Sequence, residues 1–578
     1  MNRKIFAFQR VVVCVSKSTV TVLSDTSEGL LINRVNPMDI EQISYSPSDE
    51  HSPVKALVTG LALVGYLQLS GGMYLGVITK AVRAAFLGEH EIFAISEIQW
   101  VPVSFGLTHA NTKHLSHIDN LFRGSDFFFS HSLNLDGGER FRWNQTHSDA
   151  FNTPNSAWSV SIIHGSVRSV AFSCLGRAFE LCLIGRRSRH FAGTRYRKRG
   201  INWAGACANE VETEQILVSF GPPDTVMSFK QIRASVPLRW TQESHGLIPK
   251  PEVLVRHDDL RLEATQRHFA QLLARYQGPV HAVSLLTQRA GSAEAPLGTE
   301  YLNAVEYLRE TQEMDIELIE FDLKAAANDV PGQETQVSFS MYVEASRHAH
   351  TLAKQTRWTV QCNEKITEKQ LGIVRTNCLD CLDRTNIFQY VLGLECLSEQ
   401  LIELGVLETP LRPSWVSTSA PSRLVVLIEA LFDAVGDQLS FQYAGTAAHK
   451  KYSSEGTGSL VNSGRELFIS LSRHYSSAFT DNDKQNALNL FRGLYDAETE
   501  AACGTDVIDR FVHSRKTDAC DEEKLDTDKP LRLGKPSTGY VTFAHMRIFG
   551  DPHPIQFNPV TTPIVSTPSS SRRASIFG

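Results

Sequence analysis

The amino-acid sequence predicts a mixed α/β (α+β) protein, with a β-rich N-terminal part and a larger part that contains helices. Short alternating runs at residues 11–15 and 19–23 predict strands in the first part. Further along, apolar residues recur at helical spacing over 387–395 and again over 424–435. With 42% hydrophobic residues in 578, the chain can bury a large core and is expected to form two or three domains.

The charge and the cysteines limit the class of protein. The formal net charge of −6 argues against a general nucleic-acid binder, because such proteins usually carry a basic excess. The 10 cysteines are scattered and form no dense disulfide framework, and a catalytic thiolate needs a reducing compartment. We therefore expect a cytoplasmic protein.

Two stretches bear on targeting and membrane insertion. Residues 1–9 mix polar and aromatic side chains, which is not typical of a secretory signal. Residues 56–79 carry no charge and are long enough to cross a bilayer. Their glycines, with Gln68 and Ser70 beside the pair Gly71-Gly72, instead favour two apolar elements joined by a turn. We expect buried core here and no transmembrane segment.

Residues 375–386 concentrate the chemistry of the chain, and they read Arg-Thr-Asn-Cys-Leu-Asp-Cys-Leu-Asp-Arg-Thr-Asn. A β-branched run before them and a helical pattern after them predict strand, loop and helix. Cys378 begins the loop, Arg384 closes it, and Thr385 and Asn386 can cap the helix. Amides at a helix N-terminus bind phosphate and stabilise a thiolate, and an arginine offers a fork of donors to phosphoryl oxygens. The pattern indicates a nucleophilic cysteine beside a phosphate site.

Two other chemistries use closely spaced thiols. Cys378 and Cys381, together with Cys362 and Cys396, could supply four zinc ligands, although the outer spacings are long and no second close pair exists. A thioredoxin-like dithiol is the other alternative, but an arginine-bearing loop has no redox purpose. The nucleophile is favoured over both, and neither a metal nor a cofactor is expected.

The twelve-residue string resembles the P-loop of the Sac-domain phosphoinositide phosphatases, whose signature is Arg-Thr/Ser-Asn-Cys-x-Asp-Cys-Leu-Asp-Arg-Thr-Asn, and every fixed position matches. The resemblance implies a β-rich N-terminal Sac subdomain packed on a cysteine-phosphatase-like catalytic domain, in which a central sheet is flanked by helices. It makes Cys378 the nucleophile and Arg384 the phosphate ligand, and it gives Cys381 a packing role. The loop residues that it places around the substrate are Asn377, Leu379, Cys381, Leu382 and Thr385.

The general acid has two candidates in the same loop. Asp380 and Asp383 lie where a dianion is to be bound, so a charged carboxylate is unfavourable there unless it is protonated or paired with a cation such as Arg375. A protonated carboxyl can donate to the leaving alkoxide. We predict Asp380 as the general acid and Asp383 as the second candidate, while both could instead brace the loop as hydrogen-bond acceptors.

A basic cluster precedes the P-loop, with seven arginines and lysines and no acid in residues 186–199. Such a cluster near a phosphate loop would attract an anionic headgroup or bilayer, or it could be a solvated surface strip. Residues 193–201 with 209–215, and residues 231–237, resemble two further Sac motifs, which favours the functional interpretation. The substrate-binding residues predicted from these segments are Arg195, Lys198, Arg199 and Arg233.

The likeness covers roughly residues 10–500. It weakens between about 280 and 330, where Lys324 stands in place of a histidine. Beyond the P-loop, a core helix is expected to end at Gly436. The last similar segment begins at Asp483. We predict a Sac N-terminal domain over 1–182, a catalytic domain over 183–500 with its P-loop at 378–384, and an extension over 501–578 that is largely linker or disordered.

The sequence thus predicts a phosphoinositide phosphatase that acts through a phosphocysteine intermediate. The likeness favours the 4-phosphate first, then the 3-phosphate or 3,5-bisphosphate. The expected partners are phosphoinositide lipids, with peripheral association on endomembranes (ER, Golgi or endosome), and regulatory proteins that bind the N-terminal domain or the tail. Two alternatives remain open: a non-catalytic phosphoinositide-binding scaffold, and a cysteine phosphatase acting on soluble inositol phosphates or phosphoprotein.

Overall fold

The structure is a computed structural model of the 578-residue chain. It describes residues 9–45, 56–69, 72–104, 109–153, 156–195, 197–221, 223–242, 252–323, 334–363, 365–413, 423–448 and 483–494. Lys324 and the predicted extension over 501–578 lie outside these ranges.

A small antiparallel sheet of five strands begins the fold, in the order β4-β3-β2-β1-β5. Its strands are β1 (Val11–Val15), β2 (Thr19–Ser24), β3 (Glu28–Asn33), β4 (Ile40–Ser44) and β5 (Ala56–Gly60). Alternate residues of β2 are buried, as expected for a strand with one face inward. That face, with Val20 and Val22, packs in one core with Leu75 and Val77. The strands predicted at 11–15 and 19–23 are confirmed.

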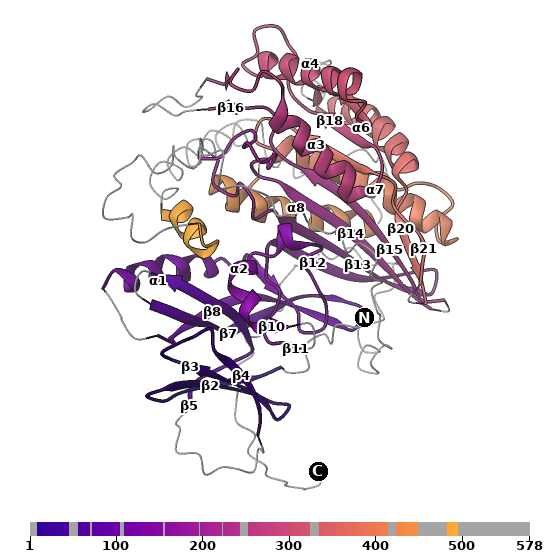
Figure 1. Cartoon of the computed structure of the whole chain (residues 1–578). Helices are drawn as coiled ribbons and strands as arrows, with labels where there is room; N and C mark the ends of the chain where they lie inside the picture. The colour runs from indigo at the N-terminus through magenta and orange to yellow at the C-terminus, as the bar shows by residue number, and fades with distance from the viewer. Residues whose placement is uncertain are drawn as a thin grey trace.

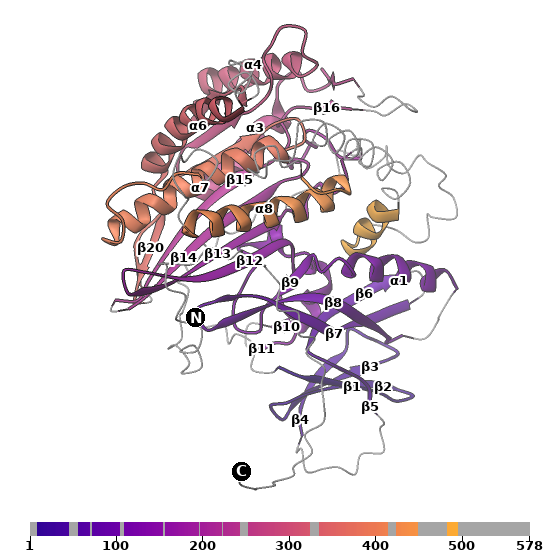
Figure 2. The same ribbon diagram turned by 180° about the vertical axis from the view of Figure 1, so that it is seen from behind.

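One sheet of thirteen strands forms most of the remaining fold (Figures 1 and 2). Its main path is β19-β18-β22-β15-β14-β13-β12-β9-β8-β7-β6, and β20 joins it at β15 with β21 beside it. The strands are β6 (Ala62–Leu69), β7 (Gly72–Leu87), β8 (His90–Pro102), β9 (Phe127–Phe129), β12 (Ile163–Cys174), β13 (Arg177–Arg187), β14 (Val211–Phe220), β15 (Thr225–Arg233), β18 (Val280–Ser284), β19 (Ile316–Glu320), β20 (Thr359–Cys362), β21 (Lys365–Glu368) and β22 (Ile373–Asn377). Because β13 spans residue 182, the backbone ladder runs through the expected domain boundary, and the division there stays a prediction.

Four neighbouring strands at one end of this sheet, β15, β22, β18 and β19, run parallel to one another. Thr376 of β22 pairs with Arg233 on one side and Val283 on the other, and Asn377 pairs with Ser284. The carboxyl ends of parallel strands meet at one edge, and open α/β sheets bind ligands there. The segments that follow β22 and β18 therefore lie together at that edge.

Helices cover both faces of the sheet at this end. On one face, α6 (Glu334–Thr356), α7 (Asp383–Glu403) and α8 (Arg423–Ala444) contribute to one core, and α7 and α8 cross the near side in Figure 2. On the other, α3 (Glu263–Tyr276) and α4 (Ala295–Gln312) share a second core with Ile232 and Ile373. Ala282 and Val283, adjacent in β18, belong to different cores, as the two faces of a strand should. The predicted sheet with flanking helices is confirmed.

The helix that was expected to end at Gly436 continues to Ala444. Gly436 instead allows α8 to approach α7, since a Cβ there would lie 2.6 Å from Nδ2 of Asn386. Gly445, with a φ of 73°, follows the helix and ends it. The prediction was wrong because glycine occurs both where two helices approach closely and where a helix ends, and the sequence does not distinguish the two.

In the uncharged stretch, residues 56–60 form β5, residues 62–69 form β6 and residues 72–79 begin β7. Leu63, Val64 and Leu75 are fully buried, in agreement with the predicted core, whereas Ser70 and Gly71 at the predicted turn lie outside the described residues. Across the described ranges, no helix is long and apolar enough to cross a membrane.

The remaining elements are α1 (His109–Phe122), η1 (Glu139–Phe141), α2 (Gln145–Ser148), η2 (Asp149–Phe151), β10 (Asn152–Thr153), β11 (Ser156–Ala157), β16 (Trp240–Thr241) and β17 (Leu254–Val255).

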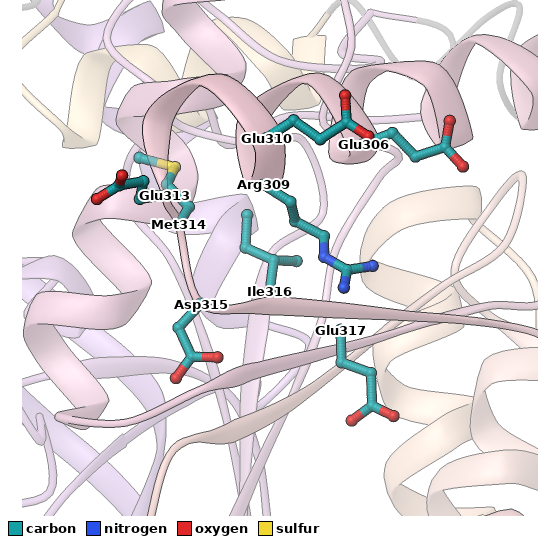
Figure 3. Close-up of a pocket in the computed structure, with 8 residues that line it drawn as sticks. All are labelled: Glu306, Arg309, Glu310, Glu313, Met314, Asp315, Ile316 and Glu317. Carbon is teal, nitrogen blue, oxygen red and sulfur yellow. The ribbon is translucent and has the colours of Figure 1, made fainter.

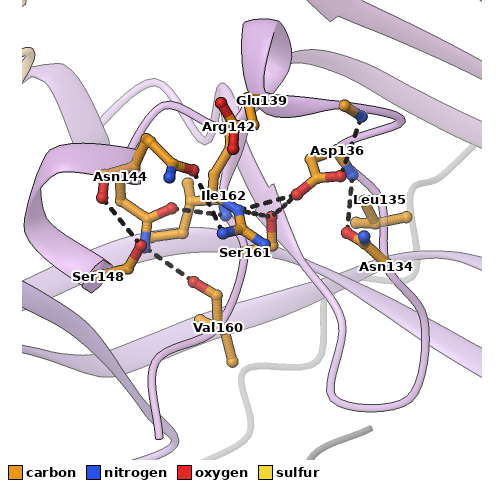
Figure 4. Close-up of polar contacts among 12 residues, drawn as sticks. Asn134, Leu135, Asp136, Glu139, Arg142, Asn144, Ser148, Val160, Ser161 and Ile162 are labelled. Atoms are coloured by element: carbon orange, nitrogen blue, oxygen red, sulfur yellow. Dashed lines mark hydrogen bonds and ion pairs between the residues drawn. The ribbon is translucent and has the colours of Figure 1, made fainter. Parts of the chain in front are cut away.

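The connection between β9 and β12 is held by polar side chains (Figure 4). Asp136 Oδ2 accepts hydrogen bonds from Arg142 Nε at 2.9 Å and Ser161 Oγ at 2.7 Å. Asn144 Nδ2 donates to the carbonyls of Val64 and Val160, at 2.8 Å each. These bonds fasten the connection to β6, so buried backbone groups in a long irregular segment find partners.

Candidate active site

The P-loop connects β22 to α7. Cys378 directly follows β22 and α7 begins five residues later, which confirms the predicted strand, loop and helix. The predicted capping is wrong: the N-cap is Leu382, no side chain bonds there as a cap, and Thr385 and Asn386 lie inside the first turn. Cys381 adopts a left-handed φ of 53°, which is uncommon for a residue with a Cβ and occurs at functional loops.

The thiol of Cys378 is 2% exposed and accepts two hydrogen bonds. The Cys381 N–H donates to Sγ at 3.1 Å, and the Thr385 hydroxyl donates at 3.3 Å. Burial raises the pKa of Cys378, but hydrogen bonding from Cys381, the charge of Arg384 and the Thr385 hydroxyl outweigh burial and lower the pKa to about 6. Burial raises the pKa of Cys381 well above its ordinary value, so Cys381 stays a thiol. The loop thus activates one of its two cysteines.

Replacing Thr385 with valine should move the pH dependence of Cys378 alkylation upward by about one pH unit, since a hydrogen bond to a charged group contributes about 1.5–3 kcal/mol. The thiolate fraction, and with it the alkylation rate, would then fall off at higher pH than in the wild type. Iodoacetamide labelling of Cys378, read by peptide mass spectrometry from pH 4.5 to 8, measures this. Thr351→Val, which removes a hydroxyl bonded within α6, is the matched control. An unchanged profile in Thr385→Val would contradict the assigned role.

The guanidinium of Arg384 is held beside the thiol by groups that follow β18. Its Nη1 donates to the Leu285 carbonyl at 2.7 Å, and its two Nη atoms contact the carboxylate of Glu294 at 2.7 and 2.9 Å. Sequence reasoning missed Glu294. An acid just before the helix start at Ala295-Pro296 was visible in the sequence, but not its contact with a residue 90 positions away.

Asp380, the predicted general acid, lies between two predicted substrate-binding arginines. Arg195 contacts its carboxylate through Nε at 3.0 Å and Nη2 at 2.7 Å, and Arg199 contacts it through Nη2 at 2.7 Å. Arg199 also donates to the Leu379 carbonyl at 3.1 Å. The side chain of Asp380 is 20% exposed, and the second candidate, Asp383, opens α7 half-buried. Nearby guanidiniums favour the ionised carboxylate, so in this arrangement Asp380 anchors the two arginines over the loop.

The basic residues 186–199 do not form one surface strip. Arg186 is buried in ion pairs with Glu212 at 3.0 Å and Glu214 at 2.6 Å. Arg187 is also buried, whereas Arg197 is exposed. Lys198 lies over the ring of Phe191, with Nζ 4.7 Å from its centroid. The structure therefore divides the cluster into two buried arginines, two arginines at the P-loop, the half-buried Arg189 and Lys198, and the exposed Arg197.

Two further arginines lie buried behind the loop. Arg233 is 1% exposed and donates to Gln389 at 2.9 Å and to Asn386 at 3.0 Å. Because it is buried, it can affect a substrate only through the loop, and not by the direct contact that was predicted. Burial lowers the pKa of Arg233 to about 10. Arg375 donates to His268 at 2.9 Å and to Asn377 at 3.1 Å. Both contribute positive charge beneath the P-loop.

The other predicted loop residues support the loop from within. Asn377 is buried and donates to Ser284 at 3.3 Å. Leu382 packs with Tyr443 and Ala444 of α8. Cys381 donates to the Ala234 carbonyl at 2.8 Å, the packing role that the resemblance implied.

The last Sac-like segment, a helix over residues 483–491, holds the loop that carries Arg195. Gln485 accepts from the Thr194 N–H and donates to the Ala192 carbonyl, each at 3.2 Å. The backbone carbonyl of Tyr443 in α8 accepts from the Arg195 N–H at 2.9 Å. A segment almost 300 residues away thereby fixes the arginines that contact Asp380.

The four cysteines considered as zinc ligands are not gathered. Within the described residues, no three or more histidine, cysteine or acidic side chains lie close enough to hold one metal ion. Cys362 lies in β20 next to Thr225, and Cys396 is buried in the core around α7. The zinc alternative is therefore wrong for these four residues.

A hollow of about 820 Å³ lies between α4 and the start of β19 (Figure 3). Its lining is mostly acidic: Glu306, Arg309, Glu310, Glu313, Met314, Asp315, Ile316 and Glu317. It lies at the amino end of β19, whereas the P-loop follows the carboxyl end of the parallel strand β22. Carboxylates repel a phosphate, so this hollow has no part in phosphate binding.

Comparison with known proteins shows what the chain is similar to. The family model of the SacI homology domain matches residues 61–328. The chain is 30% identical to Phosphoinositide phosphatase SAC4 of Arabidopsis thaliana, over 77% of this chain and 62% of that protein. It is 29% identical to Phosphatidylinositol-3-phosphatase SAC1 of the same plant, over 81% of this chain and 62% of that protein.

A fungal relative extends the comparison. The chain is 30% identical to Polyphosphoinositide phosphatase of Schizosaccharomyces pombe, over 75% of this chain and 55% of that protein. The chain thus spans roughly three fifths of the length of these relatives. A solved structure of a Legionella phosphoinositide phosphatase aligns with a TM-score of 0.23 and 14% identity, over 50% of this chain and 38% of that one, which is too low to bear on the fold. The match shows that residues 61–328 of the chain are similar to the SacI homology domain, and these relatives are similar over at least 75% of the chain.

Proposed function

We propose that the protein hydrolyses a monoester phosphate of phosphatidylinositol phosphates through a phosphocysteine intermediate. The observation that carries the proposal is the buried Cys378, which directly follows β22 and precedes α7. Hydrogen bonds within the loop and the charge of Arg384 lower its pKa to about 6, so it is a thiolate at neutral pH. The relatives are named phosphoinositide phosphatases, which supports the same substrate class.

The chemistry follows from the positions of the groups. The Cys378 thiolate attacks phosphorus, an S–P bond forms, and the P–O bond to the inositol oxygen breaks. The leaving alkoxide takes a proton and departs as a ring hydroxyl. Arg384 and the loop amides stabilise the charge on the transferring phosphoryl group. Water then attacks the phosphocysteine, inorganic phosphate leaves, and the thiolate is restored.

Asp380 donates the proton in this proposal. In the structure its carboxylate balances Arg195 and Arg199. The phosphates of a bound headgroup compete for the same guanidiniums and draw them away, which removes the cations that favour the ionised carboxylate and allows Asp380 to carry a proton. Substrate binding thereby prepares the acid.

Asp380→Asn should lower kcat for a phosphoinositide about a hundredfold, the usual size of a general-acid contribution. It should leave hydrolysis of p-nitrophenyl phosphate nearly unchanged, because nitrophenolate departs without a proton. Steady-state kinetics with both substrates measure the difference, and Asp383→Asn tests the second candidate in the same way. Equal losses on both substrates would mean that Asp380 only braces the arginines.

The proposal also ranks which phosphate of the inositol ring is hydrolysed. The 4-phosphate is ranked first, with the 3-phosphate and 3,5-bisphosphate beside it, and the name of one relative, a phosphatidylinositol-3-phosphatase, favours the 3-phosphate. The deciding experiment is phosphate release from a panel of phosphoinositides in vesicles, with EDTA present. Release from at least one lipid supports the proposal and names the substrate, whereas release from none overturns it.

We also propose that the protein works at membrane surfaces, peripherally on the cytoplasmic side of endomembranes. The exposed Arg197, close in sequence to the arginines at the P-loop, presents positive charge that would attract an anionic leaflet. The same panel, repeated with water-soluble headgroups, tests this. Turnover of soluble headgroups as fast as of lipids would contradict a membrane substrate.

A further inference from the structure

The carboxylate of Glu294 occupies one end of the Arg384 guanidinium. Its Oε2 accepts from Nη1 at 2.7 Å and its Oε1 accepts from Nη2 at 2.9 Å, while Nη1 also donates to the Leu285 carbonyl at 2.7 Å. A guanidinium has five N–H donors, so these bonds use three of them. No described residue accepts from the other two, the Nε–H and the second Nη2–H. They lie side by side on one edge of the planar group and form a fork that fits two phosphoryl oxygens.

Glu294 is itself held in a frame that includes the P-loop strand. Its Oε2 also accepts from the Thr287 N–H at 3.0 Å, and its own N–H donates to Ser292 Oγ at 3.2 Å. The Leu285 N–H donates to the Asn377 carbonyl at 2.8 Å, which ties the segment after β18 to the end of β22. The Glu294 carboxylate is thus fixed relative to the loop, and its two contacts with Arg384 fix the guanidinium there as well.

We propose that Glu294 is a positioning residue for the reaction: it orients Arg384 so that the Nε–H and Nη2–H fork faces the phosphoryl group at Cys378. The inference rests on the proposed phosphatase function, but it makes a separate claim about oxyanion binding. An arginine side chain has several rotatable bonds, and fixing its fork in advance avoids that ordering at the moment of reaction.

Electrostatics alone makes the opposite prediction. Glu294 is an anion beside an anion site, so a carboxylate that only balanced the charge of Arg384 would oppose oxyanion binding. Removing such a residue would tighten the binding of a phosphate-like anion. Removing a positioning residue would weaken it. The sign of the change therefore separates the two roles.

The test uses the full-length protein and Glu294→Gln, which keeps the size of the side chain, removes its charge and sets an amide donor against the Arg384 donors. The probe is tungstate, a phosphate-shaped oxyanion, and the readout is protection of Cys378 from iodoacetamide at pH 7. The matched control is Asp258→Asn, which removes the carboxylate of another two-point arginine pair, with Arg239 at 3.0 and 2.8 Å.

The Glu294→Gln protein should need about tenfold more tungstate for half-protection and should lose about tenfold in kcat with little change in KM, because a misdirected donor fork costs transition-state stabilisation. Glu294→Asp, which retains the charge, should recover part of both losses. Asp258→Asn should match the wild type in protection, in turnover and in its unprotected alkylation rate.

Equal or tighter protection in Glu294→Gln would overturn the inference. So would the loss of Cys378 alkylation in that variant without tungstate, because the residue would then hold the loop together rather than orient the arginine. If the wild type releases phosphate from no lipid while protection depends on Glu294 as expected, the proposed function fails and the claim that Glu294 orients Arg384 for oxyanion binding stands. If the wild type is active and protection is independent of Glu294, the reverse holds.

Discussion

Replacing Cys378 with serine should lower phosphate release from phosphoinositide vesicles by at least about a thousandfold, because a covalent mechanism cannot run without its nucleophile. A serine hydroxyl at this position stays protonated at neutral pH, whereas the loop lowers the pKa of the Cys378 thiol to about 6. Phosphate release measured with EDTA present, wild type against Cys378→Ser, gives the ratio. Binding of both proteins to the same vesicles shows whether the variant has kept its lipid site.

Cys174→Ser is the matched control for this prediction. Cys174 lies at the end of β12 and has no part in the loop, and burial raises the pKa of its thiol. It should leave turnover unchanged. A Cys378→Ser protein that retains more than a tenth of wild-type turnover would contradict the thiolate mechanism, and a wild type that binds vesicles without turnover would favour a lipid-binding scaffold.

The pH dependence of Cys378 alkylation in the wild type independently checks the direction of the Cys378 pKa shift. Because the folded-state pKa of Cys378 lies near 6, below the ordinary value of 9.0, the reactive thiolate is present above about pH 6 and is lost as the pH falls through that value. The cysteines Cys207, Cys381 and Cys396 have raised pKa values through burial and should stay unlabelled at pH 7.

The core of the site was predictable because its parts are adjacent in the chain. Cys378 and Arg384 are separated by five residues, and a strand before them and a helix after them are enough to bring the thiol, the amides and the guanidinium together. The contacts that tune this loop are not local. Arg195 meets Asp380 across 185 positions, and Glu294 meets Arg384 across 90. No periodicity or spacing rule reaches that far.

The same distinction explains the fold. The strands at 11–15 and the helices after the P-loop follow from local patterns, but β9 joins β12 through Phe128 and Ile163, a pairing that makes one sheet of both halves. A run of basic residues likewise cannot reveal that Arg186 is neutralised by acids in a neighbouring strand. The run of basic residues predicted an exposed cluster, but ion pairs with acids of a neighbouring strand bury Arg186.

Replacing Arg384 with lysine should lower kcat about a thousandfold and yet leave Cys378 ionised, because lysine keeps the positive charge and loses the planar fork of donors. Arg384 supplies both a positive charge and a planar fork of donors, so the lysine variant tests the fork separately from the charge. The acid limit of Cys378 alkylation should stay near pH 6, set by Cys381, Thr385 and the retained cation. The measurement pairs that alkylation profile with phosphate release from the preferred lipid.

Arg384→Met supplies the comparison, since it removes charge and fork together. Its turnover should fall at least as far as that of the lysine variant, but its alkylation limit should also move to higher pH, because the arginine charge is one of the causes that lower the pKa of Cys378. A lysine variant with near wild-type turnover would show that charge alone suffices. The Nε–H and Nη2–H pair that Glu294 leaves open would then have no catalytic use, and the two-point contact that fixes Arg384 would serve the stability of the loop rather than the transfer of phosphate.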